Sequence, residues 1–296
     1  MPEFNFNSPD QEISHPDLEK YNVRLFIKRD DLIHPFISGN KWRKLKYNLI
    51  KAQQENKTHL VTFGGVWSNH LLATACAAAT FGLASSAFVR GEDINTDVLF
   101  LCRMFGMKLQ FVDRDSYREK TQLYYNYFGN DSKAYFINEG GSGPEATKGC
   151  SEIIEELQEK YDHIFIAAGT GTTAAGVING TKEYQSKAEV HVVPVLKGAD
   201  FLKEDIRQLL EDDYPFNLHS DYHFGGYAKT QPELLEFIKS FTALTGILID
   251  PVYTGKMLYA LFDLVKTGKI KPGTKVLAIH TGGLFGILGM KEKFRF

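Results

Sequence analysis

Two hydrophobic patterns alternate along this chain. Short runs rich in Val, Ile and Phe are typical of buried strands, and longer segments between them repeat apolar residues every three or four positions, as amphipathic helices do. The predicted strands are Val23–Lys28, His59–Phe63, Ser86–Arg90, Lys108–Val112, Ala134–Ile137, His163–Ala168, Glu189–Val195 and Lys275–His280. The predicted helices are Lys41–Gln54, Ser68–Thr80, Val98–Phe105, Tyr117–Phe128, Glu145–Glu159, Thr172–Tyr184, Gln231–Thr245 and Lys256–Val265. This alternation favours an α/β fold in which parallel sheets carry helices on both faces.

One uncharged stretch, Leu71–Val89, is long enough to be considered as a membrane span. It is rich in Ala, Thr and Ser and is interrupted by Gly82, so a helix, a turn and a buried strand explain it better. The first four residues lack the basic start and the apolar run of a signal peptide. We therefore expect a soluble, cytoplasmic protein.

The composition adds a few exclusions. The 296 residues are 43% hydrophobic and 24% charged, which is ordinary for a globular protein of one large or two modest domains. The net charge of −2 provides no basic surface for nucleic acid or an anionic membrane, so neither is expected as a partner. The three cysteines, Cys76, Cys102 and Cys150, form no Cys-x-x-Cys pair. We expect reduced thiols and no metal site.

Glycine-bearing turns follow several predicted strands, where ligands bind in open α/β sheets. The turn Gly169–Thr173 joins an apolar strand to a helix of small residues, so its backbone N–H groups and hydroxyls would suit a phosphate group. It lacks the Gly-Lys-Ser/Thr of a Walker loop and the third glycine of a dinucleotide fingerprint. The plain alternative is a tight turn that packs a helix on a strand.

A second candidate segment contains Lys28-Arg29-Asp30-Asp31 and, further on, Gly39-Asn40-Lys41-Trp42-Arg43-Lys44-Leu45. Lys41 is predicted to open a helix after a Gly-Asn turn. Other cations near a fixed lysine disfavour its ammonium form, and the free amine is the form that a Schiff-base lysine needs. By composition alone, the basic residues of this segment would be a solvated helix face.

Taken in order along the chain, these segments resemble the pyridoxal-phosphate enzymes of fold type II. The resemblance is greatest to the branch that contains aminocyclopropane-carboxylate deaminase and D-cysteine desulfhydrase, and it runs nearly end to end. The matching segments are 28–31, 39–45, Ser68-Asn69-His70, Gly169–Thr173, Gly226-Tyr227, Asp250–Lys256 and His280–Gly283.

The resemblance implies roles for individual residues. Lys41 would hold pyridoxal 5'-phosphate covalently and move the substrate's α-proton, Asn69 would bind the ring hydroxyl oxygen, and Ser68 would lie beside the substrate carboxylate. Tyr227 and Tyr253 would line the substrate side, although either tyrosine could instead be a core residue. The remaining cofactor-binding residues would be Lys44, Gly169, Thr170, Gly171, Thr172 and Thr173 at the phosphate and Thr281 near the pyridine nitrogen. His70 is expected to support the site from behind or pack the helix.

The chain differs from the ring-opening deaminases at two positions. Those enzymes usually carry Glu after Asp-Pro-Val-Tyr and Leu in His-Leu-Gly-Gly, where this chain has Thr254 and Thr281. Both positions look like D-cysteine desulfhydrase. A hydroxyl at the pyridine nitrogen makes a weaker electron sink than a carboxylate does, and a weaker sink suffices when a good leaving group departs. Trp67, where the family often has Gln, is a further difference.

The resemblance implies two open, mostly parallel, twisted-sheet domains with the cofactor in the cleft between them, as in the tryptophan synthase β-chain. We expect a large domain of residues 1–45 plus 151–296 and a small domain of residues 46–150. The implied enzyme is a homodimeric lyase that converts a small amino acid, most closely D-cysteine, into a keto acid and ammonia, with sulfide as the third product. The alternatives are 1-aminocyclopropane-1-carboxylate deaminase, a dehydratase or racemase of small D-amino acids and, in another class, a non-catalytic protein that binds phosphate ligands.

Overall fold

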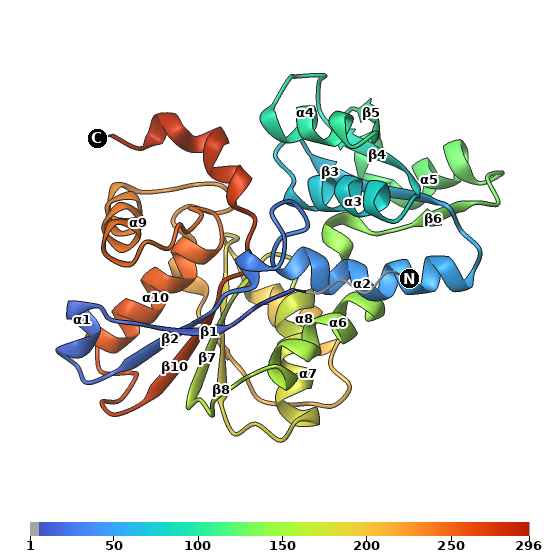
Figure 1. Ribbon diagram of the computed structural model, residues 1–296. Coiled ribbons are helices and arrows are strands. Elements are labelled where there is room, and N and C mark those ends of the chain that lie inside the picture. The colour runs from blue at the N-terminus through green and yellow to red at the C-terminus, as the bar shows by residue number, and fades with distance from the viewer. Residues whose placement is uncertain (1–5, 296) are drawn as a thin grey trace.

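The computed structural model describes residues 6–295, which form two β-sheets, each with helices on both faces (Figure 1). The first four residues, on which the signal-peptide expectation rests, lie outside this range. The large sheet has the strand order β1 (Asp10–Ile13), β2 (Arg24–Lys28), β10 (Lys275–Ile279), β7 (His163–Ala168), β8 (Glu189–Pro194) and β9 (Asn217–Leu218). β1 is antiparallel to β2, and each later pair is parallel.

The small sheet is parallel throughout, with the order β5 (Lys108–Val112), β4 (Ala84–Arg90), β3 (His59–Gly65) and β6 (Ala134–Phe136). One of its faces packs on α2 (Asn40–Gln54), α3 (Asn69–Thr80) and α4 (Asp97–Met104), and the other on α5 (Lys120–Phe128). In Figure 1 this sheet lies at the upper right and α2 runs between it and the large sheet.

Alternating side chains explain why helices cover both faces of the large sheet. Along β7, Ile164 and Ile166 face one core, while Phe165 and Ala167 face the other. The first core is closed by α6 (Pro144–Glu155), α7 (Thr172–Glu183) and α8 (Leu202–Arg207). The second is closed by α1 (Pro16–Glu19), α9 (Pro232–Thr245) and α10 (Thr254–Lys266).

The α/β prediction is confirmed, and each predicted strand and helix has a counterpart. The predicted ends differ from the observed ones by a few residues. For example, the helix predicted to reach Glu159 ends at Glu155, four residues earlier. The short elements β1, β9, α1 and α8 carry too few residues to show a period, and the sequence did not reveal them. The stretch Leu71–Val89 forms most of α3, a turn with Gly82 at φ +68°, and β4. Within residues 6–295, no helix has both the length and the hydrophobicity to cross a membrane.

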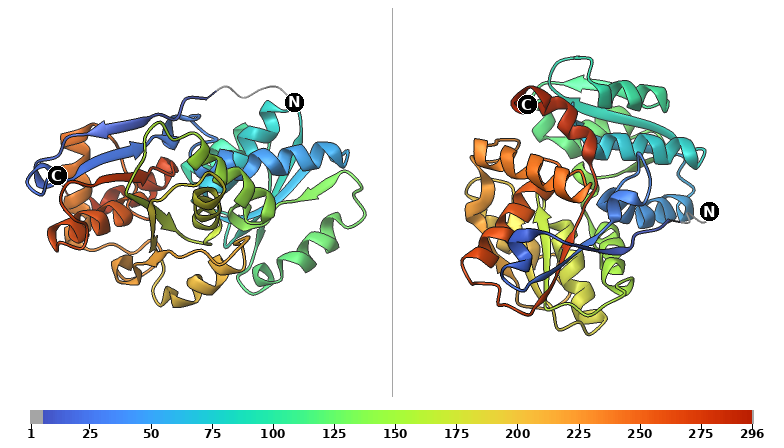
Figure 2. Two further views of the ribbon diagram at one scale, coloured as in Figure 1. Left: turned by 90° about the horizontal axis from the view of Figure 1, so that it is seen from below. Right: turned by 60° about the vertical axis from the view of Figure 1, so that its left-hand side comes forward.

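Two long-range contacts join the sheets. Helix α6 packs on both α2 and α7, and the C-terminal 3₁₀ segment Leu284–Lys293 contacts α3 and α4 of the small sheet (Figure 2). All small-sheet strands come from residues 59–136, and all large-sheet strands come from 10–28 and 163–279. The division at residues 45/46 and 150/151 stays a prediction.

Candidate active site

Segments that follow strands of both sheets meet at one cavity. Parallel strands end at the same edge of a sheet, so turns that are far apart in the sequence come together there. Most predicted site residues line the cavity. Ser68 and Thr172 are adjacent in sequence to residues that line it, and Tyr227 lies against Tyr253 of the lining. The lining consists of Asn40, Lys41, Lys44, Asn69, Gly140, Ala167, Ala168, Gly169, Thr170, Gly171, Thr173, Ala174, Tyr253, Thr281, Gly282 and Gly283.

A tight contact between two glycine turns places Lys41 at the cavity. Gly39 has φ +63°, and a Cβ there would lie 1.8 Å from the carbonyl oxygen of Thr281. Gly282 is also too close for a side chain, since its added Cβ would lie 2.9 Å from the backbone nitrogen of Gly39. Only glycine permits this approach. The turn before α2 is thereby fixed against the end of β10, and Lys41 follows it directly.

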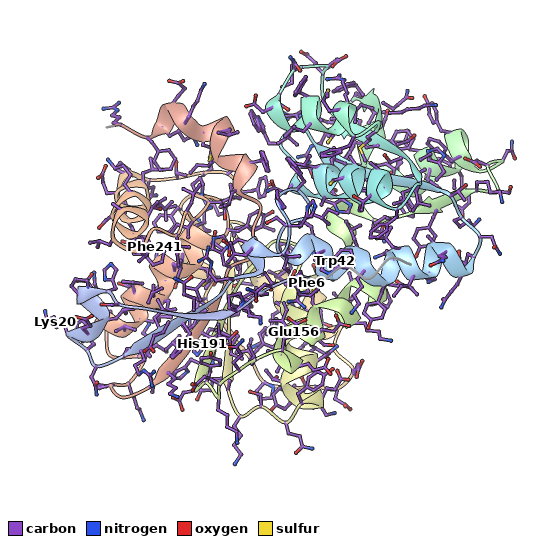
Figure 3. All side chains as sticks on the ribbon, viewed as in Figure 1. Phe6, Lys20, Trp42, Glu156, His191 and Phe241 are labelled. Atoms are coloured by element: carbon purple, nitrogen blue, oxygen red, sulfur yellow. The ribbon has the colours of Figure 1, made fainter. Side chains whose placement is uncertain are left out.

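A buried ion pair holds the same turn from the other side. The guanidinium of Arg43 donates to both carboxylate oxygens of Asp30, at 2.9 and 3.2 Å, and both side chains are fully buried. The Asp30 carbonyl accepts from the backbone nitrogen of Gly39 at 2.9 Å. Arg43 also pairs with Glu156, which follows α6; Figure 3 labels Glu156 on the large-sheet side of α2. The first turn of α2 is therefore anchored to the large sheet.

The amine of Lys41 is poised to lose its proton. Burial lowers the pKa of Lys41 to about 7, and the neighbouring charge of Lys44 acts in the same direction. Lys44 is also buried, and its Nζ donates to the carbonyl oxygen of Gly140 at 3.2 Å. Burial likewise lowers the pKa of Lys44. The two lysines lie one helical turn apart and face the same cavity.

The turn between β7 and α7 forms an anion cradle. Gly171 has φ +77° and stands immediately before α7, so the first backbone N–H groups of that helix face the cavity edge. Thr170 and Thr173 line the cavity, whereas the hydroxyl of Thr172 lies 3.3 Å from that of Thr170. The hydroxyl of Thr173 accepts from Asn40 Nδ2 at 2.9 Å. The helix dipole and Lys44 both favour a phosphate here.

The start of α3 presents one unused polar atom. Asn69 Nδ2 donates to the Gly283 carbonyl at 2.8 Å, while buried Asn69 Oδ1 has no partner within residues 6–295. Ser68 caps α3 by accepting from the Leu71 backbone nitrogen at 3.4 Å. An unpaired buried amide oxygen is costly, so Asn69 suits a site whose ligand supplies the missing partner.

His70 lies behind the cavity. Its Nε2 is 2.8 Å from the hydroxyl of Thr62, and the ring is buried beside Gly141. Burial and then the charges of Lys41 and Lys44 lower the pKa of His70 well below its usual value. A neutral, enclosed imidazole does not exchange protons with a substrate near neutral pH. The expectation of a supporting role therefore fits this geometry.

Two tyrosines lie together, one of them in the cavity lining. The ring of Tyr253 lies 6.2 Å from that of Tyr227, which is 52% exposed. Burial raises the pKa of Tyr253 well above its usual value, and the nearby Tyr227, to which it is hydrogen bonded, adds to this shift. A Cβ on Gly169 would lie 3.2 Å from Tyr253 Cε1, so the phenol sits directly over the anion cradle. Tyr253 is therefore a neutral proton donor inside the cavity.

The structure separates the two threonines that the sequence treated together. Thr281 lines the cavity beside Gly282. Thr254 does not: it is fully buried, and its hydroxyl donates to Asp250 Oδ1 at 2.5 Å. Asp250 also accepts from the backbone nitrogens of Tyr253 and Thr254 at the start of α10. Because capping α10 already uses the Thr254 hydroxyl, Thr281 is the one of these two threonines that is placed at the cavity.

Sequence reasoning quoted Asn40 and Lys256 within motifs but gave them no role. Asn40 bridges the start of α2 to the anion cradle through Thr173. Lys256 is fully buried, and its Nζ donates to the carbonyl oxygens of His223 and Gly226 at 2.8 Å each. It thereby holds the loop that carries Tyr227. The sequence did offer a signal for each residue: Asn40 directly follows Gly39, and Lys256 lies two residues after Thr254, both within segments of the family resemblance.

Together these groups suit a phosphorylated aldehyde with a polar ring. The amine of Lys41 can attack a carbonyl, the β7–α7 turn and Lys44 can bind a phosphate, and Asn69 offers a free acceptor to the ring.

Comparison with known proteins gives consistent results. The profile of the family described as "Pyridoxal-phosphate dependent enzyme" matches residues 9–282. A mitochondrial Arabidopsis thaliana protein named bifunctional D-cysteine desulfhydrase/1-aminocyclopropane-1-carboxylate deaminase is 32% identical over 90% of this chain and 73% of its own length. A Rhizobium rhizogenes 1-aminocyclopropane-1-carboxylate deaminase is also 32% identical, over 92% of this chain and 90% of its own. The crystal structure of an ACC deaminase homologue superimposes with a TM-score of 0.89 and 29% identity, covering 98% of this chain and 93% of that one.

Proposed function

Because this chain belongs to the pyridoxal-phosphate-dependent enzymes, in the branch of D-cysteine desulfhydrase and 1-aminocyclopropane-1-carboxylate deaminase, we propose that it eliminates the β-substituent of a small D-amino acid. The cofactor is pyridoxal 5'-phosphate. With D-cysteine and water as reactants, the products would be pyruvate, hydrogen sulfide and ammonia, which balances all atoms. The observation that carries this choice is the absence of any carboxylate from the cavity lining within residues 6–295.

The cofactor-binding set follows from charge and donor chemistry. The N-terminus of α7, the hydroxyls of Thr170 and Thr173, and the Lys44 ammonium would hold the phosphate. Asn69 would bind the ring's hydroxyl oxygen, and Lys41 would bind the aldehyde carbon. The cradle and Lys41 line the same cavity, which supports a ligand that reaches both.

Lys41 is the proposed base. When bound, pyridoxal phosphate withdraws electrons from the α-carbon of the attached substrate. The lowered pKa of Lys41, about 7, means that its amine can accept the α-proton near neutral pH. Ser68 and the α3 N-terminus beside Asn69 would receive the substrate carboxylate, because backbone donors there lack helical partners.

Tyr253 is the proposed acid for the leaving group. Its raised pKa keeps the phenol protonated, so it can donate to sulfur as the Cβ–S bond breaks. Tyr227 would recharge it with a proton from solvent, since Tyr227 is half exposed and hydrogen bonded to Tyr253. Lys256 would keep this pair together by fixing the Tyr227 loop.

The cavity favours elimination over ring opening. With Thr254 committed to Asp250, Thr281 is the hydroxyl that can meet the pyridine nitrogen, and no carboxylate of the lining can stabilise a proton there. Electron withdrawal is then weaker. Departure of a thiolate compensates for this, whereas a cyclopropane carries no comparable leaving group. The absence of an electrostatic partner commonly costs about a hundredfold in rate.

A panel of substrates tests the proposal. The loaded enzyme should release pyruvate and sulfide from D-cysteine, and pyruvate from β-chloro-D-alanine. It should form 2-oxobutyrate from 1-aminocyclopropane-1-carboxylate about a hundredfold more slowly or not at all. L-cysteine is the matched chirality control. Comparable turnover of both substrate types would contradict the argument from the lining.

The ring-opening deaminase is the second candidate, because two relatives carry that activity in their names over nearly this whole chain. Robust ring opening without elimination would establish it in place of the desulfhydrase. We further propose a cytoplasmic homodimer, a proposal supported by the family resemblance alone. Light scattering of the purified enzyme and cell fractionation test these two points.

A further inference from the structure

Three histidines form a row at the end of the large sheet that is opposite to the cavity. His163 opens β7, His191 lies in β8, and His219 follows β9. His163 Nδ1 lies 3.0 Å from His191 Nε2, and His191 Nδ1 lies 2.9 Å from His219 Nε2. The last residue of β7 precedes the anion cradle, so six residues at about 3.3 Å each separate His163 from Gly169 by about 20 Å. Figure 3 shows His191 low on the large sheet, below the start of α2.

Glu189 brings a carboxylate to the first two histidines. Its Oε2 lies 3.8 Å from His163 Nδ1 and 3.9 Å from His191 Nε2. In the part of the chain that the structure describes, these three side chains are the group placed to share a metal ion. With sides of 3.0, 3.8 and 3.9 Å, the triangle of these atoms has its equidistant point about 2.1 Å from each corner. Zinc bonds to imidazole nitrogen and carboxylate oxygen are about 2.0–2.2 Å long.

The hydrogen-bonded row can adopt the tautomers that a metal needs. A shared ion requires lone pairs on His163 Nδ1 and His191 Nε2, so the proton of His191 must sit on Nδ1. That Nδ1–H then donates to His219 Nε2, which fixes the ring as the outer partners of metal-bound histidines do. The ring of Phe165 stacks on His191 at 4.4 Å and holds it in place.

The inner histidine is enclosed and presents both ring nitrogens to its neighbours in the row. His191 is buried, with Nε2 toward His163 and Nδ1 toward His219. Glu189, by contrast, is exposed and reaches the two imidazoles from the solvent side. Two neutral imidazoles and one carboxylate are borderline donors that suit Zn²⁺ better than the hard cations Mg²⁺ and Ca²⁺.

We propose that His163, Glu189 and His191 form a Zn²⁺ site, oriented by His219 and open to one water molecule. The ion would tie β7 to β8 at their first residues and so brace the sheet that carries the anion cradle. The sequence does not reveal this site, because its ligands lie on separate strands with no recognisable spacing. It is independent of the proposed elimination reaction.

Zinc titration of the whole enzyme tests the site. The cofactor-loaded protein is stripped with a chelator, dialysed and titrated with zinc sulfate in a calorimeter. We expect one equivalent to bind and to raise the Tm. Glu189→Gln, at an exposed position, and His163→Asn should each weaken binding at least about tenfold, and His219→Asn about 10- to 100-fold. Glu183→Gln, an exposed glutamate on α7, is the matched control and should bind as the unaltered protein does.

Cobalt identifies the donors. Co²⁺ bound at the site should give a visible spectrum of nitrogen and oxygen ligands without a thiolate charge-transfer band. A thiolate band would assign the ion to a cysteine and overturn the proposal. No binding at all, or wild-type affinity in either Glu189→Gln or His163→Asn, would also overturn it.

Discussion

Replacing Gly171 by alanine is expected to lower the free energy of unfolding by about 2–5 kcal/mol. Two costs add. Gly171 has φ +77°, and a residue with a Cβ pays about 1–2 kcal/mol in this left-handed region. The added Cβ would also lie 2.8 Å from Ile206 Cγ1 and 3.3 Å from Leu202 Cδ1, both on fully buried side chains of α8. Overpacking of this kind costs about 1–3 kcal/mol.

A second glycine separates the two costs. Gly198 has φ +66°, yet a Cβ there meets nothing within 4 Å, so Gly198→Ala should lose only the conformational part, about 1–2 kcal/mol. Urea unfolding of the cofactor-free protein, with the m-value held constant, measures both variants. Adding Ile206→Ala to Gly171→Ala removes Ile206 Cγ1, the atom that the new Cβ would overlap. The double variant should therefore be more stable than additivity predicts. Equal losses at Gly171 and Gly198 would refute the clash.

The remaining predictions concern three lysines. Borohydride reduction of the loaded enzyme and peptide mapping should place the pyridoxyl group on Lys41, and Lys41→Ala should lose both the label and nearly all turnover; a label on Lys44 would contradict the assignment. Burial lowers the pKa of Lys41 to about 7 from 10.5, so the reactive amine forms through pH 7. Cofactor uptake by the cofactor-free protein should therefore accelerate from pH 6 to 8 and then level off, and a rate still rising toward pH 10 would show an ordinary lysine. Lys256→Met removes charged hydrogen bonds to three carbonyls, including Val195 at 3.5 Å, so kcat/KM should fall about tenfold or more while the cofactor stays bound. Unchanged kcat/KM would show that the loop that carries Tyr227 keeps its position without Lys256.

Sequence patterns predicted the longer helices and strands well because each contains enough residues to show its hydrophobic period. The run His163–Ala168 is apolar and is followed by glycine. In the structure it forms β7, whose side chains alternate between two cores, and the glycine begins the turn after it. The cavity was predictable for a related reason: turns after parallel strands must meet at one edge, whatever the side chains beyond them.

The patterns failed where the hydrogen-bond partner of a side chain had to be known. The sequence indicated Thr254 as a difference that bears on the pyridine nitrogen, whereas its hydroxyl is bonded to Asp250, four residues away, and it does not line the cavity. The pairing of Asn40 with Thr173 joins residues that are 133 positions apart and leaves no local period to read. Hydrogen-bond satisfaction in the folded state decides such cases, and a single sequence does not display it.

The enclosed lysines show how hydrogen bonding distinguishes a structural lysine from a reactive one. Lys28 Nζ is 2.6 Å from the Ser8 carbonyl and pairs with Asp10, and Lys256 is surrounded by backbone carbonyls. Lys44 donates to Gly140. Within residues 6–295, Lys41 alone of these four has no hydrogen-bond acceptor for its amine, although its backbone is fixed by the Gly39 turn. An unpaired ammonium is unfavourable in such a place, and relief comes from losing the proton or from bonding to a carbonyl carbon. The fold therefore fixes the backbone of the one lysine of these four whose amine it leaves without a partner. A residue that acts as nucleophile and base needs such a fixed position.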